Sequence, residues 1–486
     1  MDPSSRTAKP NIVVILADDM GWGDVGCYGS TKIPTPNMDR LAAEGARLTN
    51  VHSASSVCTP SRYALMTGRY AWRGVLKRGV LRGHSPAIIE PGRTTIASML
   101  REQGYGTAAI GKWHLGLGWR RRDGSVRNAF ETGPEPLVTH SDSAPAERPE
   151  VRDDYGYEID YSSPFVGGPL DYGFDRFFGI AGTLNTPPYC FLDQDRTLGI
   201  PNREKEIYYV SQRPGLQTPG WRDDEVDVRF AQEACHWIRR QDENKPFFLY
   251  VATSSPHIPC VPPEFARGRS EAGTRGDAVW MVDWVVGQVM EVLDDRGLAD
   301  DTLVIVTSDN GAIYGEWGSP ETYGHASNGP WRGQKADIWD GGHREPFVAR
   351  WPRSIPAGRV SDAPVCLTDL LPTFAEVSGA GKSYEVEDGL NALGVLTGLG
   401  SIDPHRTMIH HSGNGTFAIR RDEWKAVLGS GSGGFSVPIG ASTRSEGQLY
   451  NLVDDPGETR NLWHELPEIV AALIGELQPR EEDGIP

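Results

Sequence analysis

The chain has 486 residues, too many for one ordinary core, so one large domain and a smaller one are expected. Its formal net charge of -17 argues against a nucleic-acid partner, and no apolar run approaches the roughly 20 residues that span a bilayer. Residues 1–10 lack the apolar centre of a signal peptide. We expect a periplasmic or secreted protein whose export signal is absent from this sequence, and a cytoplasmic location is the alternative.

The first predicted element is a buried strand over residues 11–17, a continuous apolar run with β-branched residues that is typical of a parallel sheet. Asp18 and Asp19 follow it directly. Ligands in open α/β sheets collect beyond the carboxyl ends of strands, so this pair indicates a site for a hard cation. A solvated turn is the alternative for the pair considered alone.

Residues 57–69 read Val-Cys-Thr-Pro-Ser-Arg-Tyr-Ala-Leu-Met-Thr-Gly-Arg and predict a helix start. Pro60 fits the first turn, where a missing N–H costs little, so Cys58 should lie at or just before the N-terminus. Free N–H groups and the positive end of the helix dipole favour an anion there. Arg62 follows one turn later on the same face and can hold a negatively charged partner. For a lone cysteine, a buried structural thiol is the alternative.

Strands and helices then alternate up to about residue 400. Strands are predicted over residues 246–252, 302–307 and 346–352, and residues 106–116 are predicted to be a strand that leads into a glycine-rich turn. Helices are predicted over 35–45, within 91–104, and over 226–241, 277–297 and 363–379. If the strand after residue 106 continues to His114, Lys112 and His114 point to the same side. His257 and the pair Asp309 and Asn310 each follow a later strand, so their side chains should meet Asp18 and Asp19 at one edge of the sheet.

Two further regions differ from this pattern. Residues 120–220 are irregular and mix aromatic with charged side chains, which suits sugar rings, although loops packed on the surface are an equal alternative. Beyond residue 400, short strands over 408–411, 416–420, 424–428 and 448–452 predict a small antiparallel sheet, with a helix over 467–477 packed on it. We therefore expect an α/β domain over residues 1–400 and an α+β subdomain over 401–486.

The motifs resemble those of type I sulfatases, in the same order, from residue 11 to residue 462. Cys58, Pro60 and Arg62 with Thr-Gly-Arg at 67–69 are similar to the family signature. Further similarities are Gly-Lys-Trp-His-Leu-Gly at 111–116, Pro-His-x-Pro at 256–259, Arg-Gly-x-Lys at 332–335 and the closing segment at 449–462. Asp340 stands where the family usually has Glu, and Glu345 where an apolar residue is common.

The resemblance implies an alkaline-phosphatase-like fold, with a mostly parallel central sheet flanked by helices. It implies that a formylglycine-generating enzyme oxidises Cys58 to formylglycine, and that Ca²⁺, or Mg²⁺, is bound as well. The implied metal ligands are Asp18, Asp19, Cys58, Asp309 and Asn310. The implied catalytic residues are Cys58, Arg62, Lys112, His114, His257 and Lys335, and the implied substrate contacts are Lys112, His257, His325 and Lys335.

In the implied reaction, the hydrate of the formylglycine aldehyde attacks the sulfur of a sulfate ester. His257, alone or with Lys335, protonates the departing alcohol, and His114 takes the proton whose loss expels sulfate. The chain broadly resembles bacterial carbohydrate sulfatases, some of which act on galactose or galactosamine 6-sulfate, so a sulfated mono-, oligo- or polysaccharide is the expected substrate. A phosphate or phosphonate ester hydrolase on the same scaffold is one alternative. A non-catalytic sulfoglycan-binding protein, with Cys58 unmodified, is the other.

Overall fold

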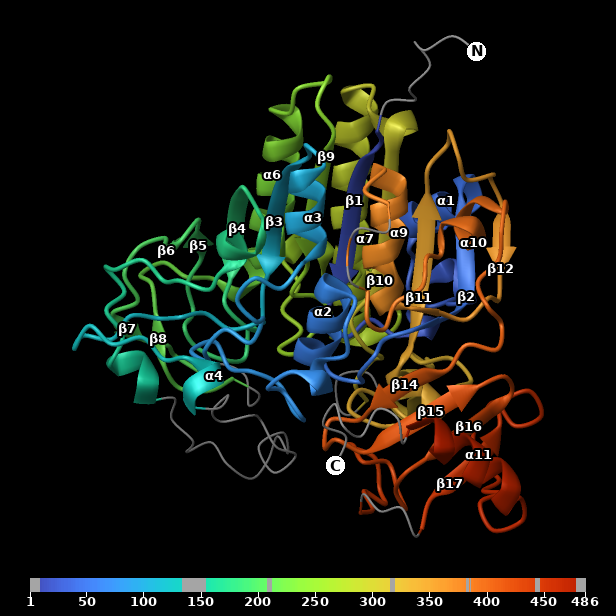
Figure 1. Cartoon of the computed structure of the whole chain (residues 1–486). Helices are drawn as coiled ribbons and strands as arrows, with labels where there is room; N and C mark the ends of the chain where they lie inside the picture. The colour runs from blue at the N-terminus through green and yellow to red at the C-terminus, as the bar shows by residue number, and fades with distance from the viewer. Residues whose placement is uncertain are drawn as a thin grey trace.

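The computed structural model describes residues 9–132, 154–207, 212–314, 320–381, 384, 386–441 and 446–477. Its centre is a large sheet with helices on both faces, and a smaller sheet lies beside it in the C-terminal part of the chain (Figure 1). From one edge to the other, the large sheet contains β12 (Arg359–Ser361), β2 (Ala46–His52), β11 (Arg344–Arg350), β10 (Thr302–Ser308), β1 (Asn11–Ala17), β9 (Phe247–Ala252), β3 (Gly106–Lys112), β4 (Arg176–Ile180), β5 (Leu192–Asp193) and β6 (Arg196–Thr197).

The middle of the sheet is parallel. β10, β1, β9, β3 and β4 run in one direction, whereas β11 is antiparallel to both of its neighbours. In register, Ala17 pairs with Ser308 of β10, and Leu16 pairs with Ala252 of β9. The carboxyl ends of these strands therefore reach the same edge of the sheet, which confirms the predicted mostly parallel α/β architecture.

Alternate residues of β1 face two separate cores. Val14 and Leu16 belong to a core that includes residues of α2 (Cys58–Thr67), α3 (Ile96–Glu102) and α9 (Leu370–Ser378). Val13 and Ile15 belong to the core on the other face, with α1 (Pro36–Glu44), α6 (Val226–Arg239) and α7 (Gly273–Asp295). The remaining short helices are α4 (Ala129–Thr132), α8 (Pro320–Tyr323) and α10 (Leu393–Thr397).

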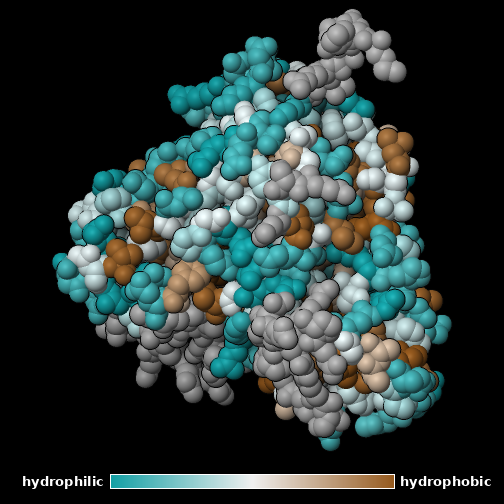
Figure 2. Space-filling view, in the orientation of Figure 1, coloured by the Kyte–Doolittle hydropathy of each residue, from teal (hydrophilic) through white to brown (hydrophobic). Residues whose placement is uncertain are grey.

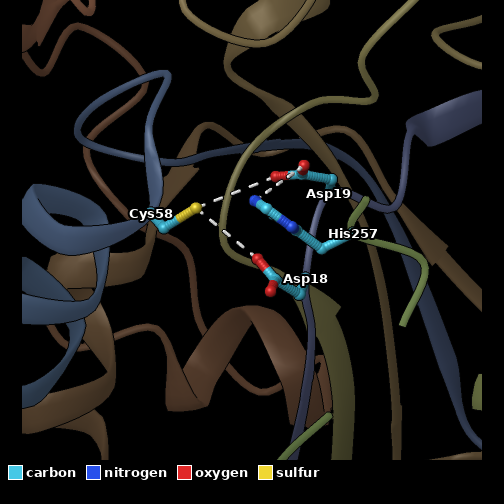
Figure 3. A group of neighbouring side chains, drawn as sticks. All are labelled: Asp18, Asp19, Cys58 and His257. Atoms are coloured by element: carbon cyan, nitrogen blue, oxygen red, sulfur yellow. Dashed lines mark hydrogen bonds and ion pairs between the residues drawn. The ribbon is translucent and has the colours of Figure 1, made fainter. Parts of the chain in front are cut away.

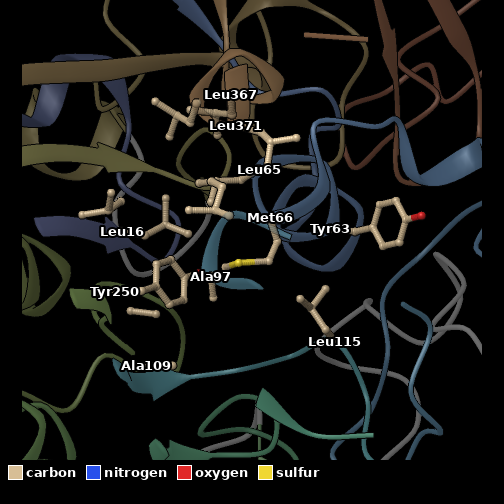
Figure 4. Close-up of a cluster of buried hydrophobic side chains, with 14 of the residues drawn as sticks. Leu16, Tyr63, Leu65, Met66, Ala97, Ala109, Leu115, Tyr250, Leu367 and Leu371 are labelled. Carbon is tan, nitrogen blue, oxygen red and sulfur yellow. The ribbon is translucent and has the colours of Figure 1, made fainter. Parts of the chain in front are cut away.

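Packing of α2 on the first core fixes the start of that helix. Leu65 and Met66 are fully buried in the same cluster as Leu16, Tyr250 and Leu371 (Figure 4). Burial of side chains of this size contributes roughly 1.5–3 kcal/mol each. The helix ends at Gly68, whose φ of 64° closes it with an N–H bond to the Ala64 carbonyl. The C-terminal half of α2 thus anchors its first turn, where Cys58 lies.

The smaller sheet is antiparallel, in the order β14 (Met408–His411), β15 (Phe417–Arg421), β16 (Trp424–Val427) and β17 (Gln448–Asn451). Leu473 and Leu477 of α11 (Pro467–Leu477) are buried in its core. This confirms the predicted sheet and helix, whereas the boundary at residue 401 stays a prediction. A two-residue hairpin pairing, β7 (Arg203–Glu204) with β8 (Leu216–Gln217), lies within the irregular region.

Three of the predicted helices and strands begin two or more residues away from the expected position. The helix expected from residue 363 begins at Leu370, because Val365 and Cys366 form β13 (Val365–Cys366), which pairs with β2. Helix α7 begins at Gly273 rather than at residue 277, and the strand expected from residue 346 begins at Arg344. Of the region predicted to be irregular, residues 133–153 and 208–211 lie outside the described residues.

The visible surface is predominantly hydrophilic. On the face drawn in Figure 2, hydrophobic residues form separate spots rather than one continuous patch. Within the described part of the chain, no helix combines the length and apolarity needed to cross a membrane.

Candidate active site

Four oxygen-bearing side chains meet where β1 and β10 end. Asp18 and Asp19 follow β1, and Asp309 and Asn310 follow the neighbouring β10. All four residues are fully buried. The Asp19 N–H donates to Asp309 Oδ1 over 3.1 Å, and Asn310 Nδ2 donates to Asp19 Oδ1 over 2.7 Å. The parallel pairing of two strands thus brings together residues that are about 290 positions apart in sequence.

Cys58 faces this cluster from the first turn of α2. Its Sγ lies 3.5 Å from Asp18 Oδ1 and 3.8 Å from Asp19 Oδ1 (Figure 3). Burial raises the pKa of the Cys58 thiol well above its ordinary value, even though Lys112 and Lys335 oppose the shift. The unmodified side chain is therefore a neutral thiol at physiological pH and a poor nucleophile.

Arg62 fixes two of the carboxylates from the next turn of α2. Its Nε and Nη2 lie 2.9 and 2.7 Å from Asp309 Oδ2, and Nη2 lies 3.5 Å from Asp18 Oδ1. The guanidinium is completely buried, so these ion pairs are formed out of contact with water. This confirms that Arg62 lies on the same face of the helix as Cys58, where it holds negatively charged partners.

Two lysines from distant segments bond to the carboxylates of Asp18 and Asp19. Lys112, at the end of β3, donates from Nζ to both carboxylate oxygens of Asp18 at 2.8 Å. Lys335 donates from Nζ to Asp19 Oδ2 at 2.7 Å. Burial alone would raise the pKa of Asp19, but Lys335, His257 and Lys112 together hold it below the ordinary range. Asp19 is therefore ionised under all physiological conditions.

His257 and His114 are both placed beside these charges. His257 Nε2 lies 3.7 Å from Asp19 Oδ2 (Figure 3). Its Nδ1 lies 2.6 Å from the Ile258 carbonyl oxygen. Burial, with Lys335 nearby, lowers the pKa of His257 to about 3. His114 Nε2 lies 2.8 Å from the Leu81 carbonyl oxygen, and burial with Lys112 and Arg62 lowers its pKa well below the ordinary value.

The condition under which Lys112 and His114 would point to the same side, a strand that continues to His114, is not met. β3 ends at Lys112, and His114 has a φ of 57°, so the two side chains are not related by strand alternation. Instead, the backbone N–H of Trp113 bonds to the carbonyl of Ile180, the last residue of β4, and that of His114 bonds to the carbonyl of Ala181, just after β4. The chain therefore turns after Lys112, and the turn places His114 beside the Leu81 segment.

His325, a predicted substrate contact, is bonded to Asp24, which is not one of the carboxylates around Cys58. Its Nε2 is 2.9 Å from Asp24 Oδ1. Asp24 is fully buried and pairs with Arg275 of α7, whose Nη2 also donates to the main-chain carbonyl of Asp19. Sequence reasoning missed Asp24 and Arg275. For Asp24 the available signal was a third carboxylate six residues after Asp18, whereas Arg275 lies just before the predicted helix over 277–297 and carried no such signal.

The comparison with protein families decides the assignment, because residues 10–380 match the model described as Sulfatase. The chain belongs to the sulfatase family. An N-acetylgalactosamine-6-O-sulfatase of Bacteroides thetaiotaomicron is 30% identical to this sulfatase, across 97% of this chain and 93% of that protein. Human steryl-sulfatase is 34% identical, across 86% of this chain and 74% of the relative.

Solved structures agree with this assignment. A Bacteroides thetaiotaomicron structure reported with the metabolism of multiple glycosaminoglycans has a TM-score of 0.82 at 28% identity, covering 97% of this sulfatase and 99% of that chain. The fold is therefore the alkaline-phosphatase-like fold predicted from the motifs. As a member of this family, the protein is a hydrolase of sulfuric esters.

The donor set of this sulfatase fits a hard divalent cation. Ligand atoms of Asp18, Asp19, Cys58 and His257 lie within 4.8 Å of one another, so the described residues contain a group that could hold a metal ion. Asn310 Oδ1 is buried and has no hydrogen-bond partner in the structure, although its Nδ2 is bonded. Carboxylate and amide oxygens favour Ca²⁺ or Mg²⁺ over softer metals.

Proposed function

We propose that this sulfatase removes sulfate from a sulfated carbohydrate, using formylglycine at position 58 and a divalent cation held by Asp18, Asp19, Asp309 and Asn310. The observation that carries the proposal is the position of Cys58 Sγ, 3.5 Å from Asp18 Oδ1, among buried cationic side chains. When present, the cation would polarise oxygens around the reacting sulfur, and formylglycine would supply the attacking hydroxyl of its hydrate.

The charges of the site favour an anionic substrate. Three carboxylates, on Asp18, Asp19 and Asp309, face the three basic side chains of Arg62, Lys112 and Lys335. These charges cancel, so a divalent cation would leave two positive charges in excess. This local excess explains how a chain with a net charge of -17 can bind a sulfate ester.

The basic residues have different tasks in this proposal. Lys112 and Lys335 stabilise the charge on the sulfuryl oxygens, because their buried Nζ groups lie 2.8 Å from Asp18 Oδ1 and 2.7 Å from Asp19 Oδ2, beside Cys58. Arg62 Nε donates to Asp309 Oδ2, and Nη2 forms ion pairs with Asp309 and Asp18, so this side chain holds the carboxylates in place. Such fixed dipoles and charges need no reorganisation when the sulfur–oxygen bond breaks.

Proton transfer falls to the two histidines. The bond from sulfur to the alcohol oxygen breaks, and His257, together with Lys335, gives that oxygen a proton. With Nδ1 donating to the Ile258 carbonyl, Nε2 is the atom that faces Asp19 and the site. Burial and the charge of Lys335 both lower the pKa of His257, and a bound sulfate ester would offset the lysine part of this shift, which favours a proton on this nitrogen. His114 accepts the proton whose loss releases sulfate.

The substrate class is inferred from relatives rather than from a pocket. An N-acetylgalactosamine-6-O-sulfatase is similar to almost the whole chain, which supports a sulfated amino sugar or galactose as the unit carrying the ester. The test is a screen in which defined mono- and oligosaccharides, sulfated at single positions, are incubated with protein co-expressed with a formylglycine-generating enzyme. Free sulfate is measured by ion chromatography.

We expect release of sulfate from at least one 6-sulfated saccharide, and none from the matched Cys58→Ala protein, which should still bind the sugar. Peptide mass spectrometry over residues 57–69 establishes whether Cys58 carries the aldehyde. Hydrolysis of nitrophenyl phosphate in preference to nitrophenyl sulfate would contradict the assignment of the reaction. Normal sulfate release by Cys58→Ala would contradict the role of position 58.

A further inference from the structure

We propose that Arg275 and Asp24 are positioning residues that hold Asp19 in the backbone conformation required for cation binding. This inference rests on the proposed cation. It assigns a task to a buried ion pair that touches neither substrate nor reacting atoms. Asp24 is fully buried and Arg275 is 1% exposed.

Asp19 has an unusual backbone conformation. Its φ of 68° lies in the left-handed region, which residues with a side chain rarely adopt. Such a conformation persists only where the surroundings hold it in place, and it is frequent at functional sites. Here the left-handed residue carries the carboxylate that meets Lys335, Asn310 and His257. The direction of that carboxylate therefore depends on what holds the main chain.

The main chain of Asp19 is held from two sides. Its N–H donates to Asp309 Oδ1 over 3.1 Å, which ties it to the end of β10. Its carbonyl accepts from Arg275 Nη2 over 2.8 Å, which ties it to α7. Met20, the next residue, donates its N–H to Ser308 Oγ over 2.9 Å. Arg275 thus supplies the one contact among these three that comes from outside the two metal-binding strands.

Asp24 keeps the guanidinium of Arg275 in the required orientation. Arg275 Nη1 lies 2.9 Å from Asp24 Oδ1, and Nη2 lies 2.6 Å from Asp24 Oδ2. This two-point contact fixes the plane of the guanidinium, so that Nη2 can also reach the Asp19 carbonyl. Both oxygens of Asp24 accept further bonds, from the Gly21 N–H and from His325 Nε2, which commits this carboxylate to positioning rather than metal binding.

The loop that carries Asp24 packs closely against a second segment. A Cβ atom on Gly21 would lie 2.2 Å from the Ser327 carbonyl oxygen, so residues 21–24 pack directly against the segment that carries His325. Arg275 Nη1 also donates to Ser327 Oγ over 2.9 Å. The guanidinium therefore joins three segments, around Asp19, Asp24 and Ser327, at one buried point.

The test compares cation affinity with stability in the full-length protein. The variants are Arg275→Lys, which keeps the charge but cannot make the two-point contact with Asp24 and also reach the Asp19 carbonyl, and Asp24→Asn. The control is Asp283→Asn on the same helix, which removes a buried carboxylate that bonds to Asn37 and Met38, away from the site. Ca²⁺ alone is titrated calorimetrically into chelator-treated protein, and thermal midpoints are recorded in parallel.

We expect both variants to bind Ca²⁺ roughly 10- to 100-fold more weakly than the wild-type protein does. This is the usual effect of removing a residue that holds a metal ligand in place. In the turnover assay kcat should fall with little change in KM, and saturating Ca²⁺ should restore much of it. Asp283→Asn should lower the thermal midpoint without changing Ca²⁺ affinity. If Arg275→Lys does not fold, Asp24→Asn alone decides the question.

The outcomes separate this inference from the proposed function. Wild-type Ca²⁺ affinity in folded Arg275→Lys or Asp24→Asn, with only the thermal midpoint lowered, would overturn the positioning role and leave the cation intact. Absence of divalent-cation binding by the wild-type protein would overturn the cation and its positioning together.

Discussion

Lys335 Nζ and Asp19 Oδ2 lie 2.7 Å apart, although 316 positions separate the two residues in sequence. The contact is buried, with 9% and 0% of the two side chains exposed. It joins the loop that follows β10 to the loop that follows β1. A lysine held this closely against a proposed metal ligand is fixed in place before substrate arrives, which is the arrangement that electrostatic catalysis requires.

The first prediction concerns this lysine. In Lys335→Met, kcat/KM for a sulfate ester should fall by roughly 10²–10³, because a charge aimed at the sulfuryl oxygens is lost. Inhibition by free sulfate should weaken as well, since the same charge binds the product. The control is Lys245→Met, at an exposed position between α6 and β9. Steady-state kinetics with nitrophenyl sulfate measures both effects, and an unchanged sulfate inhibition constant would speak against the role.

The second prediction concerns the cation. Exhaustive chelation should abolish turnover and lower the thermal midpoint, because three buried carboxylates then lose a shared partner. Ca²⁺ should restore both properties, and Mg²⁺ serves as the comparison ion. In Asp309→Ala, Ca²⁺ should fail to raise the thermal midpoint, whereas Asp39→Ala, a residue of α1, should respond like wild type. Full activity after complete removal of divalent ions would eliminate the metal from the proposal.

The strands and the cluster at their ends were predictable because each signal is local. An apolar run predicts a buried strand, and the polar pair that follows it at once, Asp18 with Asp19 or Asp309 with Asn310, marks the carboxyl end of that strand. His114 could not be placed in this way, since its own backbone is left-handed and the chain around it bonds to the end of β4 and to the residue that follows. No spacing rule relates Arg275 to Asp24, 251 positions away. Such pairs are determined by tertiary packing, which a sequence pattern does not express.

The third prediction concerns the contact between the two sheets. Lys425 of β16 is fully buried, with Nζ 2.8 Å from Asp340 Oδ1 and 2.9 Å from Glu458 Oε1. Lys425→Met removes the cation that faces both carboxylates, and should destabilise the fold by roughly 3–5 kcal/mol. Chemical denaturation should show a corresponding loss, with the exposed Lys245→Met within about 0.5 kcal/mol of wild type. Equal stability of the two variants would mean that this ion pair does not hold the smaller sheet in place.

The last prediction concerns stability at acid pH and begins with His410 of β14. Its side chain is buried, its Nδ1 lies 3.0 Å from the Ser53 carbonyl oxygen, and its ring centre is 4.8 Å from that of His343 and 5.4 Å from that of His52. Burial, with Lys425 and Arg420 nearby, lowers the pKa of His410 to about 3, although Asp340 opposes the shift. The ring is therefore neutral in the folded protein at physiological pH and well below it.

The sign of the effect follows from proton uptake. An unfolded histidine takes up a proton as the pH falls below about 6.5, whereas folded His410 does so only near pH 3, so the unfolded state gains protons first. The stability associated with neutral His410 is complete above pH 6.5 and is lost as the pH falls toward 3, by about 2 kcal/mol at pH 5. His410→Asn, which keeps a donor for the Ser53 carbonyl, should therefore lose less stability between pH 7 and pH 5 than wild type. His236→Asn, at an exposed position of α6, should show the wild-type loss. Urea unfolding at the two pH values measures the difference, and an identical loss in His410→Asn would show that this buried ring does not control acid stability.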